Sequence, residues 1–145
     1  ANLVEAALVT PLLLLLTFSI VDFAVVFYVY LALENGISQA TRFAVTGNEM
    51  DDPDNPGEPL SRDESIKMAM RQATPTLTIE DDAFTFSHMP PGGAWVGGTG
   101  GPNDIEKVTV TYDWTPLTPL VRPFFAQGEI RLTVESAMKN EGRFD

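Results

Sequence analysis

The chain has no cysteine, a single histidine, and no lysine or arginine before Arg42. The absence of cysteine excludes disulfides, thiolate zinc sites and thiol nucleophiles. Basic residues are also few: 9 Lys and Arg stand against 20 Asp and Glu, which gives a net charge of −11. Such an acidic chain does not attract a phosphate backbone, so we expect no nucleic-acid partner. Its 145 residues are enough for one domain.

Motifs for catalysis are lacking as well. His88 lies beside the turn formed by Met89-Pro90-Pro91, and no serine has a recognisable nucleophile motif around it. The glycine-rich stretch Gly92–Gly101 is followed by Pro102 and Asn103 instead of the helix that a phosphate-binding loop requires. We therefore expect a protein without enzyme activity and without a cofactor.

An acidic, proline-rich loop in the first half of the chain contains a weak calcium-like spacing. Four residues fall at positions one, three, six and twelve of an EF-hand-like loop: Asp52, Asp54, Gly57 and Asp63. Pro56 occupies the fifth position, where an oxygen ligand belongs. A solvated acidic loop is therefore the preferred interpretation, and calcium binding by Asp52, Asp54 and Asp63 is the alternative.

What the chain does have is one long apolar run, from Ala6 to Leu33. As an α-helix the run would be about 42 Å long, which exceeds the roughly 30 Å of a bilayer's hydrocarbon core. It has no basic start and is too long for a secretory signal, so we expect any processing to have occurred before Ala1 and the helix to be retained. It must then lie in a membrane or pack against other apolar helices.

Three residues distinguish this helix from a simple membrane span. Glu5 lies in the first turn, where the helix dipole favours a carboxylate; if it is buried, its partner should be the Ala1 amine of another subunit. Pro11 removes a backbone hydrogen bond and predicts a kink or a loosened turn. Asp22 lies in the middle of the run, where insertion costs about 2.5–3.5 kcal/mol. We expect Asp22 either to be protonated and bonded to Ser19 or to face a helix seam or a polar pocket, which implies neighbouring helices.

The region after the apolar run predicts a second, short helix. The first helix continues at helical spacing to about residue 46, where Gly47 is expected to cap it. Ser61 and Glu64 form a capping-box pattern, which predicts a helix that ends near Ala73.

Alternation of apolar and polar residues predicts strands in the second half of the chain, as in an antiparallel sheet with one buried face. The alternating segments are residues 76–79, 84–87, 108–114 and 130–135. Residues 90–103 and 115–123, rich in glycine or proline, are expected to be loops. The sequence thus predicts an α+β fold, with a helix over residues 1–46 and a small globular head over residues 47–145.

Several segments carry a family resemblance. At the N-terminus these are Val4 to Leu16, Ile20 to Phe23, Ala32 to Asn35 and Ala40 to Ala44. Looser matches near the other end are Val108 to Tyr112, Pro116-Leu117, and Ile130 to Met138 with Glu141. Together these segments resemble the TadE-like proteins of the tight-adherence (Tad) system, whose N-terminus is of the class III prepilin type.

This resemblance implies a pilin or pseudopilin. Such a protein is cut by an inner-membrane prepilin peptidase, held in the bilayer, and drawn into a filament by the pilus assembly machinery. The resemblance implies that Glu5 registers each incoming subunit on the Ala1 amine of a neighbour. We predict that Ala1, Glu5, Pro11 and Asp22 contribute to subunit assembly, and that the product is a helical homopolymer on the cell surface, supplied from an inner-membrane pool.

Two alternatives remain open at the level of sequence. One is a minor pseudopilin that primes or tips a pilus or a secretion machine. The other is a monomeric, membrane-anchored binding module whose glycine- and proline-rich loops hold a ligand. Long surface fibres built mainly of this chain would favour the filament subunit over both.

Overall fold

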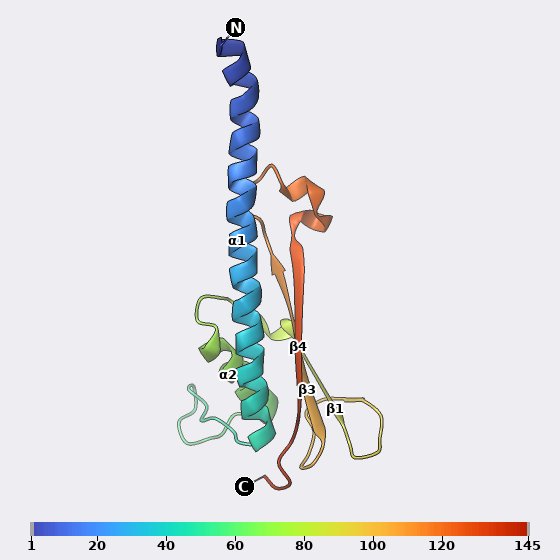
Figure 1. Cartoon of the computed structure of the whole chain (residues 1–145). Coiled ribbons are helices and arrows are strands. Elements are labelled where there is room, and N and C mark those ends of the chain that lie inside the picture. The colour runs from blue at the N-terminus through green and yellow to red at the C-terminus, as the bar shows by residue number, and fades with distance from the viewer. Residues whose placement is uncertain (1, 145) are drawn as a thin grey trace. The chain divides into compact units, whose positions relative to one another are not determined.

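The computed structural model describes residues 2–144 and has the α+β fold that the sequence predicts (Figure 1). It contains a long helix, α1 (Asn2–Thr46), a short helix, α2 (Arg62–Ala73), and a four-stranded antiparallel sheet. The strands are β1 (Phe84–Met89), β2 (Val96–Gly97), β3 (Ile105–Trp114) and β4 (Ile130–Lys139), and their order in the sheet is β2-β1-β3-β4.

The chain divides into two compact units. The first unit comprises Ala1–Leu31 and Asp113–Leu132, and the second comprises Ala32–Tyr112 and Thr133–Asp145. Helix α1 ends at Thr46, as predicted, but the compact units divide it after Leu31. The part of α1 from Ala32 to Thr46 therefore belongs to the second unit.

In the first unit, α1 is continuous through Pro11. Within residues 2–31, only Asp22 and Val29 are buried, and most of the large apolar side chains between Leu3 and Leu31 are exposed. The apolar character of this half of the helix is therefore not explained by packing within its own unit.

The remainder of the first unit is the connection from β3 to β4. It passes through two short 3₁₀ turns, Arg122–Phe124 and Ala126–Gly128, which are drawn in orange in Figure 1. Gln127 adopts the left-handed conformation, with φ of 57°, and so permits the sharp reversal before β4.

In the second unit, the C-terminal part of α1 forms one wall of a hydrophobic core. Buried core residues of this unit include Leu33, Ile37, Ala40, Ala44, Ile66, Met70, Ile79, Val108, Val110 and Val134. Gly36 lets α2 approach closely, because a Cβ atom at this position would collide with Thr74 Cγ2 and Met70 Sδ. The α1 residues of this core have the helical spacing that is visible in the sequence.

The end of α1 is closed by residues from distant parts of the second unit. Gly47 has φ of 71° and donates its N–H to the Ala44 carbonyl, as expected for a C-terminal cap. A side chain at Gly47 would collide with the Phe144 ring. The Glu141 N–H binds the Val45 carbonyl, so carbonyl groups in the last turn have partners.

Two predictions about the start of α2 and the following segment need correction. Helix α2 begins after Ser61 as predicted, but the Ser61 side chain makes no capping hydrogen bond. Residues 76–79 do not form a strand. Their backbone is used elsewhere, because Leu77 N–H binds the Thr74 carbonyl in a turn and Arg71 binds the Ile79 carbonyl.

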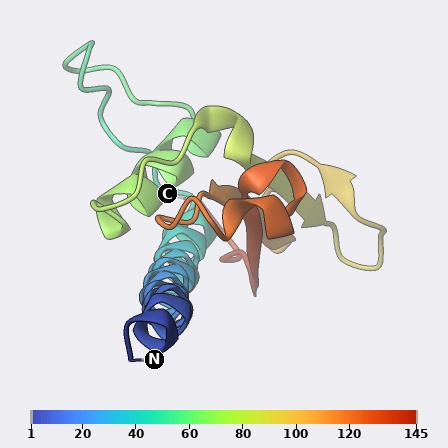
Figure 2. The ribbon, with the colours of Figure 1, turned by 90° about the horizontal axis from the view of Figure 1, so that it is seen from above.

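Two connections within the second unit project away from its core (Figure 2). Residues 48–60 form a loop closed by a β-bridge between Asp51 and Pro59. The segment 90–103, predicted to be a loop throughout, contains the short strand β2. This strand pairs with β1, with Ser87 opposite Gly97, and the two-residue length explains why alternation could not reveal it.

Candidate assembly surface and polar sites

Asp22 is the buried polar residue of the exposed half of α1, with an exposed fraction of only 5%. Its Oδ1 accepts the backbone N–H of Leu117 at 2.8 Å, and its Oδ2 accepts that of Thr118 at 3.2 Å. The predicted bond to Ser19 is wrong, because the Ser19 hydroxyl donates to the Leu15 carbonyl. Asp22 does lie in a polar pocket, but its partners are backbone amides of its own chain and not the neighbouring helices that the prediction implied.

The local sequence explains why these two amides reach Asp22. Pro116 and Pro119 have no N–H, so the donors between them are Leu117 and Thr118. Arg122 Nε donates to the Pro116 carbonyl at 3.0 Å, which holds the turn closed. The carboxylate therefore fixes a turn that is 95 residues away in sequence.

Beside Asp22, the first unit contains a groove of about 420 Å³. It is lined by Leu15, Ser19, Asp22 and Phe23 of α1 and by Trp114, Pro116, Val121, Phe124 and Phe125 of the β3–β4 connection. Apart from Ser19 and Asp22, these residues are apolar. The groove can therefore accommodate an apolar side chain or an acyl chain more readily than a polar ligand.

The other predicted assembly residues are not gathered into one site. Glu5 and Pro11 lie exposed on α1, with Glu5 in the first helical turn. Ala1, the predicted partner of Glu5 in a neighbouring subunit, lies outside the described residues. The structure thus places Asp22 in an internal polar site, while Glu5 and Pro11 lie on the exposed surface of the helix.

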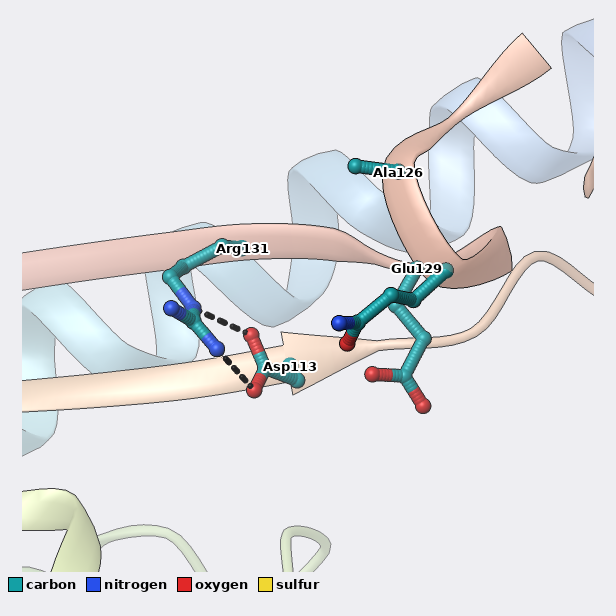
Figure 3. A pocket seen from close by; sticks show the side chains of 5 residues that line it. Asp113, Ala126, Glu129 and Arg131 are labelled. Atoms are coloured by element: carbon teal, nitrogen blue, oxygen red, sulfur yellow. Dashed lines mark hydrogen bonds and ion pairs between the residues drawn. The ribbon is translucent and has the colours of Figure 1, made fainter.

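A second polar feature of the first unit is the surface pocket at the ends of β3 and β4 (Figure 3). Arg131 donates to Asp113 in a bidentate pair, from Nε to Oδ1 at 2.8 Å and from Nη2 to Oδ2 at 2.9 Å. The hydrogen bond from Arg131 lowers the pKa of the Asp113 carboxyl. Because both side chains are exposed to solvent, the pair orients the strand ends more than it stabilises them.

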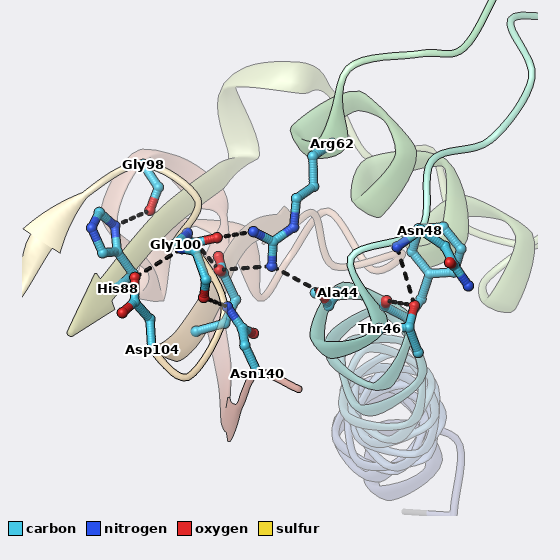
Figure 4. A network of polar contacts seen from close by, with 12 residues as sticks. Ala44, Thr46, Asn48, Arg62, His88, Gly98, Gly100, Asp104 and Asn140 are labelled. Atoms are coloured by element: carbon cyan, nitrogen blue, oxygen red, sulfur yellow. Dashed lines mark hydrogen bonds and ion pairs between the residues drawn. The ribbon is translucent and has the colours of Figure 1, made fainter. Parts of the chain in front are cut away.

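The second unit contains a buried ion pair that the sequence pattern did not predict, within a network of polar contacts around Arg62 (Figure 4). Arg62 Nη2 lies 3.4 Å from Glu106 Oε2 and also donates to the Ala44 carbonyl at 2.9 Å. The Arg62 guanidinium donates to the Gly100 carbonyl as well, and the Gly100 N–H donates to Glu106 at 2.8 Å. Arg62 thereby joins α2, the end of α1 and the sheet.

Burial raises the pKa of the Glu106 carboxyl, and the Gly100 N–H and the Arg62 charge oppose this effect. The Glu106 side chain is fully buried, and its Oε1 has no hydrogen-bond partner among the described residues. The alternation in β3 could have revealed this residue, because Glu106 lies on the same face as Val108 and Val110. An acid on a buried face requires a partner, and Arg62 supplies it.

The acidic loop does not assemble the calcium ligands that its spacing allowed. Within residues 2–144, no group of three His, Asp or Glu side chains could hold a metal ion. Asp52 Oδ1 instead accepts the Asp54 N–H at 2.9 Å, and Asp52 Oδ2 accepts the Asn55 side-chain amide at 2.8 Å. These hydrogen bonds lower the pKa of the Asp52 carboxyl. The carboxylate thus stabilises a local turn of the loop.

Comparison with models of known protein families gives a match within helix α1. The family model of TadE-like proteins matches residues 2–42. The N-terminal helix is TadE-like. This match confirms the predicted resemblance over most of α1. Comparison with curated proteins and with solved structures gives no match.

The TadE-like helix also has the properties of a membrane anchor. Within the described part of the chain, α1 is the one helix that is long and apolar enough to cross a membrane. Its most apolar stretch is largely unburied, unlike the core helix of a soluble protein. The family match and the apolar helix together indicate membrane anchoring.

Proposed function

We propose that this protein is a structural subunit of a Tad-type, type IV pilus-like surface filament and that it polymerises through its TadE-like helix. The observation that carries this proposal is the exposed apolar surface of α1 between Leu3 and Leu31, on the helix that matches the family. An apolar surface of this length requires cover by lipid or by other apolar helices. The proposed partners are the inner membrane, then further copies of this chain.

Transfer from lipid to filament gains little from the hydrophobic effect, because lipid tails are as apolar as leucine. Specific packing and polar pairing must then favour assembly. Glu5 is exposed in the first turn of α1 and has no cationic side chain near it in sequence, since the first is Arg42. We assign it the role of binding the Ala1 amine of a neighbouring subunit, with prepilin peptidase and the assembly machinery acting before this step.

The test is a Glu5→Gln variant, which keeps the size of the side chain and removes its charge. We expect normal amounts of the variant in the membrane fraction but few filaments in material sheared from the cells, measured by immunoblotting and electron microscopy. Glu58→Gln, an equal charge change in the exposed loop, should leave filament yield unchanged. Normal filaments from Glu5→Gln would contradict the pairing role.

A further inference from the structure

The β3–β4 connection in the first unit exposes an unusual number of large apolar side chains. The exposed fractions are 60% for Leu117, 69% for Leu120, 82% for Phe124 and 40% for Phe125. All four lie within nine residues of sequence, in the turn that Asp22 holds through the Leu117 and Thr118 amides. We call this segment, residues 117–125, the apolar turn.

The hydrogen bonds to Asp22 fix the apolar turn at one level along α1. Glu5 and Asp22 are 17 positions apart, which corresponds to about 26 Å along a helix. This separation is close to the roughly 30 Å thickness of a bilayer's hydrocarbon core. The two carboxylates can therefore lie at opposite faces of the hydrocarbon core, whereas the complete apolar run is too long to span it without tilt.

We propose that the apolar turn inserts into the membrane interface at the Asp22 end of the span, with Leu120 and Phe124 among the headgroups and upper acyl chains of a phospholipid leaflet. This inference rests on the membrane-anchored stage of the proposed function. Lipid then covers residues 5–22, whereas the exposed apolar residues of α1 between Asp22 and Leu31 require other copies of the chain as their cover.

Two features favour lipid over a protein partner for the apolar turn. First, the turn is continuous with the membrane helix, since its residues and those of α1 line one apolar groove beside Asp22. Second, its composition of leucine and phenylalanine with one arginine suits an interface, where apolar rings lie below the headgroups and a cation lies at their level. Arg122, which binds the Pro116 carbonyl, is the cation.

The absence of cysteine makes this proposal directly testable with single-cysteine variants of the full chain. Leu120→Cys and Phe124→Cys are each labelled with an environment-sensitive fluorophore and reconstituted in phosphatidylethanolamine–phosphatidylglycerol vesicles. Quenching is measured with lipids that carry a spin label near the headgroup or deep in the acyl chain. Leu13→Cys serves as the deep control, and Asp54→Cys, in the exposed acidic loop, as the aqueous control.

The apolar turn should insert about 5–10 Å below the headgroups. The shallow spin label should then quench fluorophores at positions 120 and 124 at least about twofold more strongly than a fluorophore at position 54. Quenching at position 13 but not at 120 or 124 would overturn the inference and leave the membrane anchor intact. Protection of positions 120 and 124 only in filaments would also overturn it, because another copy would then be the partner. Lack of quenching at position 13 would contradict the membrane stage itself.

Discussion

The two halves of α1 differ in what covers their apolar residues. In the C-terminal half, Leu33, Ile37, Ala40 and Ala44 are buried in the second unit. In the N-terminal half, leucines of similar size, such as Leu12 and Leu13, are exposed. Hydrophobicity alone therefore does not define a core: one half of the helix is covered by its own chain, and the other requires a cover from outside.

Alanine substitutions in the two halves of α1 should show the largest difference in stability. Ile37 is 1% exposed, and Ile37→Ala should lower the free energy of unfolding by about 2–5 kcal/mol because it leaves a cavity in the second unit. Leu13 is 58% exposed, and Leu13→Ala should change stability by less than about 0.5 kcal/mol. Urea denaturation in detergent micelles measures both. Equal losses would show that the two halves do not differ in this way.

The next largest effect concerns the buried pair that closes the end of α1. Glu106→Ala removes the carboxylate that pairs with the largely buried Arg62 guanidinium, so we expect a loss of about 2–3 kcal/mol in the stability of the second unit. Arg131→Ala, which breaks an exposed pair, should cost less than about 1 kcal/mol. The same denaturation assay compares them, and a larger cost for Arg131→Ala would contradict the assignment.

The buried carboxyl also predicts a pH dependence. Burial raises the pKa of Glu106 above its ordinary value of 4.5, so the unfolded chain loses this proton at a lower pH than the folded chain. Its contribution to stability is therefore most favourable below pH 4.5 and falls as pH rises through the folded-state pKa. The free energy of unfolding of the wild type, minus that of Glu106→Gln, should therefore decrease as pH rises from 4.5 through the folded-state pKa of Glu106. A difference that grows with pH would contradict the raised pKa.

A smaller, local effect is expected at Asp22. Asp22→Ala removes the acceptor of two backbone amides, one of them in a buried residue, and should cost about 1–2 kcal/mol. Hydrogen exchange should become faster at Leu117 and Thr118. The control is Ser19→Ala, which removes only a bond within the helix. Unchanged exchange in Asp22→Ala would mean that the carboxylate does not hold the turn.

The sequence was most informative where the pattern was long and local. The apolar run predicted α1, and the alternation around Val108 and Ile130 predicted β3 and β4. The partner of Asp22 could not be predicted, because it consists of backbone amides 95 and 96 residues away, which carry no side-chain signal. The Arg62–Glu106 pair was accessible in principle from the acid on the buried face of β3.

Shorter or less regular elements escaped prediction for physical reasons. Strand β2 has two residues, which is too short for alternation. Residues 76–79 alternate like a strand, but Arg71 binds the Ile79 carbonyl and the preceding turn occupies the Leu77 amide. Hydrogen bonds decide both structures: those of β2 go to β1, and those of residues 76–79 go to Arg71 and the Thr74 carbonyl. The alternation of apolar and polar residues contains no information about these bonds.

The most direct test of the filament proposal is electron microscopy of material sheared from the cell surface, combined with identification of its main polypeptide. We predict long fibres built mainly of this chain, with the N-terminal halves of α1 packed together in the fibre core. Fibres that contain this chain only as a trace component would indicate a minor, priming subunit. Detergent-soluble monomers without any fibres would contradict the filament proposal.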